Sequence, residues 1–418
     1  MSAKKVLMFG WEYPPHHSGG LGVACKGMAH ALIDNDVHVC FMLPKTLPLN
    51  ETKVKIAFAD KDVEQKTALS PHLEALAREL QNPYLNYIEY EKHLQLFIQA
   101  GGKVLPRNLY EQVDYYAALV RSMRPEELAL YDIIHAHDWL CFPAGIEAKR
   151  RTGKPLIAHI HATEFDRSGG VSVNQQVYDR EREGMHMADH IITVSEFTKR
   201  TVVNHYGIDP SKVTVVHNGN TPSENQNHSS RFSALEHLKS DGKKIVLFAG
   251  RITIQKGVDY FIHAARKVLE YHKGVYFVVA GSGDMENQII SLTAQLGISE
   301  HFLFTGYYTI EEQASLFSLA DVVVMPSVSE PFGIIPLESM SNGTPVIVSK
   351  QSGVSEVITH ALKVDFWDTD ETANKILAII HHPVLKNTLS EEGRRQVGLV
   401  TWDKAAKKMK GLYNAITT

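Results

Sequence analysis

The sequence predicts an α/β protein made of two doubly wound domains that face each other across a cleft. The chain has 418 residues, which is long for one hydrophobic core and sufficient for two. Short β-branched or apolar runs alternate with helical patterns, as in parallel sheets that are covered on both faces. A polar stretch without periodicity, residues 220–233, divides these runs into two series.

Each predicted strand ends at a small or polar residue. The first series is KVLMFG, VHVCFMLP, IIHAH, LIAHIH, HIITVS and VTVVHNG, and the second is KIVLFAGR, VYFVVAGSG, FLFTGY, VVVMPS and PVIVS. We therefore expect an N-terminal Rossmann-like domain over residues 1–222 and a C-terminal one over residues 223–395. A helical segment at 396–418 is expected to pack back on the N-terminal domain. Residues from about 60 to 126, rich in charged side chains with helical spacing, predict an insertion in that domain.

Composition excludes several classes of protein. The net charge of −4 and a pI near 6.6 supply no basic field, so nucleic acid is not expected as a partner. Cys25, Cys40 and Cys141 are few, odd in number and set in apolar surroundings, which indicates free thiols in a reducing, cytoplasmic location. No run of eighteen apolar residues occurs, so we expect no transmembrane segment. Peripheral contact with a membrane stays open.

Two acids stand in an otherwise apolar stretch, PSVSEPFGIIPLESMSNGTPVIV, at residues 326–348. Ligands of open α/β sheets bind beyond the carboxyl ends of the strands, where Glu330 is expected, with Glu338 about one helical turn further on. Free N–H groups near Gly333 and Ile334 would form an anion site. Phosphate at the helix and hydroxyls at the carboxylates describe a nucleotide sugar. The alternative is a loop acid and a solvated helix residue.

Cations follow a neighbouring strand. Arg251 and Lys256 lie in AGRITIQKG, where two fixed charges could neutralise a diphosphate leaving group without a metal. An exposed surface pair is the alternative. In the first domain, HHSGGLG precedes an amphipathic helix, and Gly19 and Gly20 would let backbone amides approach a phosphate.

Two H-x-H pairs end strands of the first domain. A four-histidine metal site is geometrically conceivable, because alternate residues of a strand share a face. Asp138 and Trp139, beside the first pair, favour a sugar-binding edge instead, and we expect no metal. The four histidines are His135, His137, His159 and His161.

As a set, these motifs resemble the retaining glycosyltransferases of the GT-B fold, the group 1 relatives that include bacterial glycogen and starch synthases. The matching segments are SGGLG, HAHDW, GRITIQKG, EPFGIIPLE and SGVSEVI, in order, from about residue 10 to 360. The resemblance implies a nucleotide-sugar donor, ADP- or UDP-glucose, bound mainly by the second domain. It also implies transfer with retention, without a cofactor or a required metal.

The resemblance also implies roles for individual residues. Arg251 and Lys256 would hold the diphosphate, Glu338 the ribose hydroxyls and Glu330 the donor sugar. His161 matches the histidine beside the reacting carbon. The remaining matches are backbone that lines the donor (Gly333, Ile334, Gly353 and Val354) and acceptor-side positions (Glu12, Asp138 and Trp139).

The leading hypothesis is a hexosyltransferase that extends an α-glucan. His17 stands where many glycogen synthases carry a lysine, which argues against ADP-glucose. Alternatives are a transferase acting on a lipid-linked or capsular saccharide, a sugar-nucleotide epimerase, and a non-catalytic saccharide-binding relative. The intact cations and acids argue against the last alternative.

Overall fold

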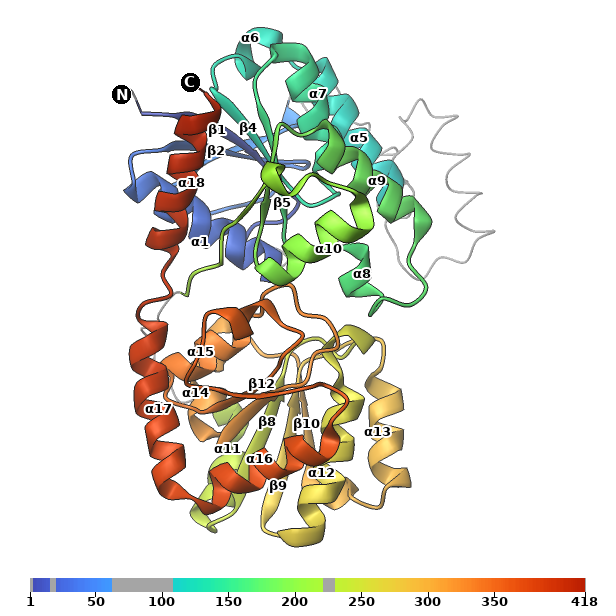
Figure 1. The fold of residues 1–418 in the computed structure, drawn as a ribbon, viewed down its shortest axis with the longest axis vertical. Coiled ribbons are helices and arrows are strands. Elements are labelled where there is room, and N and C mark those ends of the chain that lie inside the picture. The colour runs from blue at the N-terminus through green and yellow to red at the C-terminus, as the bar shows by residue number, and fades with distance from the viewer. Residues whose placement is uncertain (1–2, 16–19, 62–107, 221–229, 418) are drawn as a thin grey trace, which may run out of the picture.

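Two parallel β-sheets form two domains that are stacked along the long axis of the molecule (Figure 1). The computed structural model describes residues 3–15, 20–61, 108–220 and 230–417. The first sheet has seven strands and the second has six, and every described strand pair is parallel. This arrangement confirms the predicted fold class.

The strands follow the apolar runs of the sequence. The first sheet, in the order β3-β2-β1-β4-β5-β6-β7, contains β1 (Lys5–Phe9), β2 (His38–Leu43), β3 (Lys55–Phe58), β4 (Ile133–His137), β5 (Leu156–Ile160), β6 (His190–Thr193) and β7 (Val213–Val215). The second, in the order β10-β9-β8-β11-β12-β13, contains β8 (Lys244–Ala249), β9 (Val275–Ala280), β10 (Phe302–Gly306), β11 (Val322–Met325), β12 (Val346–Ser349) and β13 (Leu362–Val364).

Helices cover both sheets. Those that precede β7 are α1 (Gly20–Asp34), α5 (Leu109–Ser122), α6 (Pro125–Leu128), α7 (Phe142–Thr152), α8 (Glu164–Arg167), α9 (Gln175–Met187) and α10 (Glu196–Tyr206). Those that follow are α11 (Ser233–Ser240), α12 (Val258–Tyr271), α13 (Glu286–Gln295), α14 (Ile310–Leu319), α15 (Ile335–Ser341), α16 (Thr369–His381), α17 (Pro383–Val397) and α18 (Trp402–Ile416).

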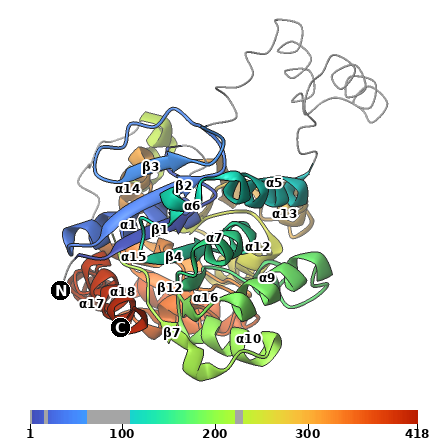
Figure 2. The same ribbon diagram turned by 90° about the horizontal axis from the view of Figure 1, so that it is seen from above.

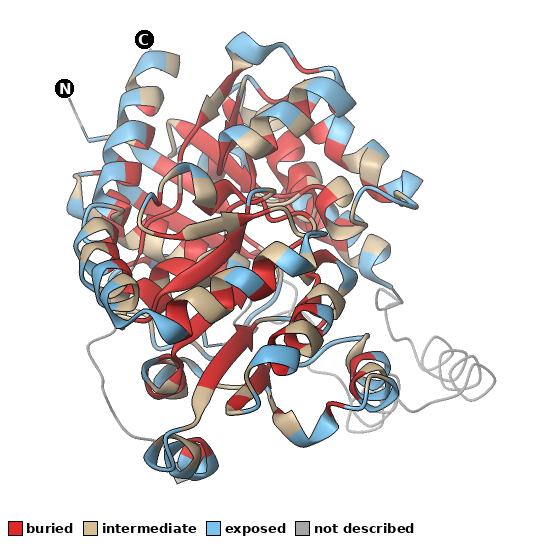
Figure 3. Ribbon diagram, turned by 60° about the horizontal axis from the view of Figure 1, so that its bottom comes forward, coloured by how far each residue is buried: buried red, intermediate tan, exposed pale blue. Residues whose placement is uncertain are grey.

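Burial explains this layering. Figure 3 shows strands that are buried along most of their length, between helices whose outer faces are exposed. In α12, for example, Val258, Phe261, Ile262, Ala265 and Leu269 are buried at the spacing of one helical face. Parallel strands need such cover on both sides, which is why their sequences read as continuous apolar runs.

Two strands were not expected from the sequence. β3 and β13 are outer strands of their sheets, and each contains a lysine and partly exposed residues. The expected insertion at about 60–126 is described only at its ends, because residues 62–107 lie outside the described part of the chain. Its last part forms α5, whose buried Tyr116 donates from its hydroxyl to the Met42 carbonyl at 2.8 Å. This helix is therefore part of the domain's core.

The chain crosses between the domains twice, and the two crossings lie side by side. The Asn220 N–H donates to the Val400 carbonyl at 2.9 Å, and Asn220 forms a parallel bridge with Thr401. After this crossing α18 packs against α1, as Figures 1 and 2 both show. Its Trp402 and Tyr413 join the buried cluster around β1. The expected domain boundary at residue 222 lies outside the described residues.

Strand order reverses once in each sheet, between β1 and β4 and between β8 and β11. At such a reversal the two connections leave toward opposite faces, and a crevice opens at the carboxyl ends of the strands. The histidine motifs lie at the carboxyl ends of β4 and β5, and the charged motifs follow β8 and β11. Within the described ranges, no helix has the length and apolar character needed to cross a bilayer.

The α1–α18 contact should be sensitive to one methyl group. In Gly27→Ala, the new Cβ would lie 2.5 Å from the Trp402 ring, so the indole must shift. We expect the free energy of unfolding to fall by about 1–3 kcal/mol in denaturant titrations. Gly411→Ala, in α18, meets no atom within 4 Å and should stabilise the protein by up to about 1 kcal/mol. Equal stability of the Gly27 variant and the parent would contradict this packing.

Candidate active site

The charged residues of the second domain meet at the carboxyl ends of β8 and β11. Lys256 Nζ lies 2.5 Å from Glu330 Oε2, and the Ser327 hydroxyl donates to the same oxygen at 3.2 Å. Glu330 is only 6% exposed. A buried carboxylate is costly unless it is paired, so the two residues stabilise each other's position. The sequence placed them in neighbouring loops, and the adjacency of β8 and β11 bears this out.

A buried glutamine, Gln255, fixes the two loops to each other. Its side-chain Nε2 donates to the Ser329 backbone carbonyl at 3.1 Å, and the backbone carbonyl of Gln255 accepts the Val328 N–H at 2.9 Å. Arg251 Nη2 donates to Gln255 Oε1 at 3.3 Å, while the guanidinium stays exposed. Sequence reasoning missed Gln255, because a neutral side chain between two cations carries no charge signal.

The segment after β12 supports the Glu330 loop from the other side. The Gly353 N–H donates to the Glu330 carbonyl at 2.9 Å, and the Val354 N–H donates to the Phe332 carbonyl at 2.7 Å. A Cβ at Gly353 would lie 2.1 Å from the Pro331 carbonyl oxygen, so only glycine fits. Both amides are thus engaged within the protein and the Val354 side chain is buried, and the expectation that this backbone lines the donor stays a prediction.

Gly333 and Ile334 lie directly before α15. Gly333 has φ of 95°, a conformation that glycine adopts most readily, and Pro336 stands in the first turn as expected. Among the described residues, neither the Gly333 nor the Ile334 amide donates to a backbone carbonyl or side chain. Both amides therefore remain available to an anion.

Glu338 lies in α15 but has different partners from Glu330. Gln313 Nε2, from α14, donates to Glu338 Oε2 at 2.7 Å, and Tyr308 is a close neighbour. Burial raises the pKa of Glu338 to about 7, because the Gln313 hydrogen bond compensates only part of the lost hydration. The two acids thus serve different parts of the site. Nothing in the sequence pointed to Gln313.

Across the interface, His161 follows β5. Its backbone N–H donates to Asp138 Oδ1 at 2.7 Å, and burial raises the pKa of Asp138 to about 7. The Asp138 carboxylate therefore positions the His161 loop. Trp139 is 5% exposed and its ring lies 5.8 Å from that of Tyr110, so it belongs to the core. The expectation that Trp139 contacts the acceptor stays a prediction, and its burial does not favour it.

The loop after β1 contains the other acceptor-side and glycine positions. Glu12 Oε1 accepts the Gly22 N–H at 2.8 Å, so its carboxylate caps the first turn of α1. Gly20 is exposed and begins α1. Gly19 lies outside the described residues.

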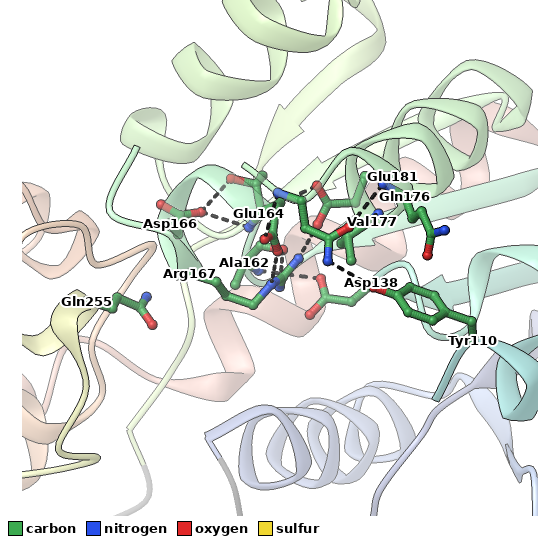
Figure 4. A network of polar contacts seen from close by, with 12 residues as sticks. Tyr110, Asp138, Ala162, Glu164, Asp166, Arg167, Gln176, Val177, Glu181 and Gln255 are labelled. Carbon is green, nitrogen blue, oxygen red and sulfur yellow. Dashed lines mark hydrogen bonds and ion pairs between the residues drawn. The ribbon is translucent and has the colours of Figure 1, made fainter. Parts of the chain in front are cut away.

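A buried polar network organises the loop after His161 (Figure 4). Arg167 donates to Glu164 at 3.0 Å, to the Ala162 carbonyl at 3.3 Å and to Glu181. The Ser329 hydroxyl donates across the domain interface to Asp166 Oδ1 at 2.6 Å. The loop that carries His161 and the loop that carries Glu330 are thereby held next to each other. These contacts were not foreseen, since they join residues far apart in the sequence.

A second contact between the domains lies nearby. The Ser195 hydroxyl, at the N-terminus of α10, donates to the Pro331 carbonyl at 2.5 Å. The Glu356 carboxylate accepts the Glu196 and Phe197 N–H groups at 2.9 and 2.7 Å and lies 2.9 Å from His217 Nε2. These bonds hold the segment that follows Glu330 against the first domain.

The four histidines of the H-x-H pairs form one cluster, in which three are buried and His161 is partly exposed. His137 Nδ1 lies 3.0 Å from His161 Nε2, and His135 Nε2 lies 3.1 Å from His159 Nδ1. Burial lowers the pKa of His161 and of His135 to about 3, so both rings are neutral at pH 7. The cluster is continuous, since ring centroids of neighbouring histidines are 4.2–5.2 Å apart.

Two family models match the chain. Residues 231–396 match "Glycosyl transferases group 1", and residues 87–223 match "Glycosyltransferase Family 4". An uncharacterized glycosyltransferase of Methanocaldococcus jannaschii is 30% identical over 98% of this chain and 97% of its own. The glycogen synthase of Mycobacterium tuberculosis is 27% identical over 85% of this chain and 80% of its own.

Solved structures share the whole fold. Sucrose-phosphate synthase from Thermosynechococcus elongatus matches with a TM-score of 0.70 at 21% identity, covering 99% of this chain and 98% of that one. The Anabaena protein HepE, solved in complex with UDP and glucose, matches with a TM-score of 0.68 at 16% identity, covering 99% and 100%.

The raised pKa of Glu338 makes stability depend on pH. Its folded-state pKa of about 7 exceeds the ordinary value of 4.5, so between these values the folded state holds a proton that the unfolded state has lost. The free energy of unfolding therefore falls as pH rises from about 4.5 to 7. Glu338→Gln should remove this fall and gain on the order of 1–3 kcal/mol over the parent between pH 5 and pH 8.

Denaturant titrations of both proteins at the two pH values measure this gain. The control is Glu371→Gln, because the exposed pair with Lys375 lowers the pKa of Glu371 and keeps it ionised at both values. A pH-independent difference between Glu338→Gln and the parent would show that Glu338 does not titrate in this window.

Proposed function

We propose that this chain, which belongs to the group 1 glycosyltransferases, transfers glucose from a nucleoside diphosphate sugar to an α-glucan with retention of the anomeric configuration. The family assignment gives the class of reaction. The identity of the sugar, the acceptor and the stereochemistry are the proposal.

One observation carries the donor side: the Lys256–Glu330 pair, held against the Arg251 loop by Gln255 at the strand-order reversal of the second sheet. A departing diphosphate develops negative charge, which fixed cations stabilise without reorganisation. Glu330 holds the Lys256 ammonium in place before the donor arrives. The free amides of Gly333 and Ile334 add donors for the diphosphate on the same loop.

The carboxylates supply acceptors for hydroxyl groups. Glu338, next to Tyr308 and Gln313, would bind the ribose hydroxyls, and Glu330 would bind the donor sugar. The Anabaena structure with UDP and glucose supports a glucose donor, and the similarity to a glycogen synthase supports a glucan acceptor.

His161 lies on the opposite side of the interface, on the loop fixed to the second domain by the Asp166–Ser329 bond. Because its imidazole is neutral at pH 7, it would act as a hydrogen-bond partner of the sugar and not as a charged acid. In the transfer, the bond between the anomeric carbon and the diphosphate oxygen breaks. A bond to the acceptor hydroxyl oxygen forms on the same face, and the hydroxyl proton passes to the departing diphosphate.

The test is nucleoside diphosphate release from ADP-, UDP- and GDP-sugars, each with and without glycogen or maltooligosaccharides. Glucan-dependent release from a glucose donor, with products one hexose longer and cleaved by an α-specific glucosidase, is the expected result. Release that requires a different saccharide would make that saccharide the acceptor in place of the glucan. Release without any acceptor would favour an epimerase or hydrolase, and no release from any donor would contradict the assignment of the site.

Lys256→Ala should lower turnover by about 10²–10³-fold, because one charged contact made in the transition state supplies a few kcal/mol. The Michaelis constant for the donor should change less than turnover does. Lys350→Ala removes an exposed lysine paired with Asp365 in the same domain and should retain parental activity. The measurement is the steady-state turnover of the two variants and the parent. Near-parental turnover of the Lys256 variant would show that this lysine does not stabilise the transition state.

A further inference from the structure

The buried histidine cluster contains ring nitrogens that the proposed transfer does not use. His137 Nε2 and His159 Nε2 are buried and have no hydrogen-bond partner within the described chain. Both residues are 0% exposed. A buried nitrogen without a partner is costly, so this cluster is incompletely hydrogen-bonded, and its other ring nitrogens decide whether it can hold a ligand.

A buried cysteine of α1 lies beside two of these histidines. Cys25 Sγ, in α1, and one ring nitrogen each of His137 and His161 all lie within 4.8 Å of one another. The two histidine nitrogens joined by a hydrogen bond are 3.0 Å apart. Two nitrogens that bind the same tetrahedral zinc ion lie about 3.3 Å apart, given Zn–N distances of about 2.0–2.1 Å. The present separation is thus close to that of two ligands of one ion.

A second group, His135, His137 and His159, meets the same distance criterion but is enclosed on all sides. Tyr413 and His159 already bond to both nitrogens of His135. The group with Cys25 includes the partly exposed His161, so it is the less enclosed of the two groups. It also combines a sulfur with two imidazoles, a ligand set that selects zinc and its transition-metal relatives over magnesium or calcium.

We propose that Cys25, His137 and His161 bind a Zn²⁺-class transition-metal ion, with its fourth coordination position open to the cleft. The Cys25 thiol must lose its proton to solvent when it coordinates the ion, so binding releases one proton. The ion replaces the His137–His161 hydrogen bond and fixes both rings.

Such an ion would inhibit the enzyme. This consequence rests on the proposed function, in which His161 faces the donor sugar. A ring nitrogen that coordinates a metal no longer donates or accepts a hydrogen bond, and the open coordination position would hold water or a hydroxyl group at that point. The site is therefore an inhibitory one that is separate from the diphosphate cations.

Cobalt(II) titration of the purified, chelator-treated protein tests the site without reference to activity. We expect one Co²⁺ per chain, with a sulfur-to-cobalt charge-transfer band, displaced by one equivalent of Zn²⁺. Cys25→Ser should abolish the band and weaken binding by at least about tenfold. Cys40→Ser removes another buried free thiol, outside both histidine groups, and should leave the band and the affinity unchanged.

Thermal unfolding of each variant without metal shows whether it folds, and Cys25→Ala provides a second variant if the serine destabilises the core. Equal cobalt affinity of the parent and the Cys25 variants would overturn the proposal. So would a site that survives loss of Cys25 but disappears in His159→Gln, because the ion would then lie in the enclosed group.

The inhibition is measured separately, as nucleoside diphosphate release at increasing zinc. Zinc should inhibit the parent and Cys40→Ser at the concentration that saturates the cobalt site, and Cys25→Ser should need at least about ten times more. If no donor is turned over, the proposed function fails while the cobalt result still decides the metal site. Metal binding without inhibition would overturn the inhibitory role.

Discussion

The hydrogen-bonded pairing of β8 with β11 is the constraint on which the candidate site depends. These strands are neighbours in space but far apart in the sequence, and the chain leaves them toward opposite faces of the sheet. The segments that follow the two strands are therefore brought together at one end of the sheet. Lys256 and Glu330 meet there, and the same logic places the loops after β1 and β4 at the facing edge of the first sheet.

The two acids of the second domain illustrate how environment sets chemistry. Glu330 is more enclosed, yet it has an ammonium partner and a hydroxyl donor. Glu338 has only a neutral amide donor among its described contacts, and burial raises its pKa. One carboxylate thus bonds to a cation and orients it, while burial raises the pKa of the other to about 7. Two glutamates with seven residues between them would look equivalent in a sequence.

Sequence patterns predicted the fold and the positions of the charged residues well, because strand ends in a parallel sheet are read directly from apolar runs. Gly333 and Ile334 lie at the start of α15, as that reasoning required. Contacts between residues far apart in the sequence could not be read from it. The Gly353 amide is bonded to the Glu330 carbonyl, Trp139 is buried, and Gln255 carried no signal although it joins the two charged loops.

The return of α18 to the first domain has a consequence for how the protein is made. On the ribosome, residues 5–215 emerge before α18, and the cluster around β1 lacks Trp402, Met409 and Tyr413 until α18 is synthesised. The second domain has its own core and all of its strands before that point. The second domain is therefore able to complete its fold first. The first domain, although synthesised earlier, completes its core only when α18 packs against it.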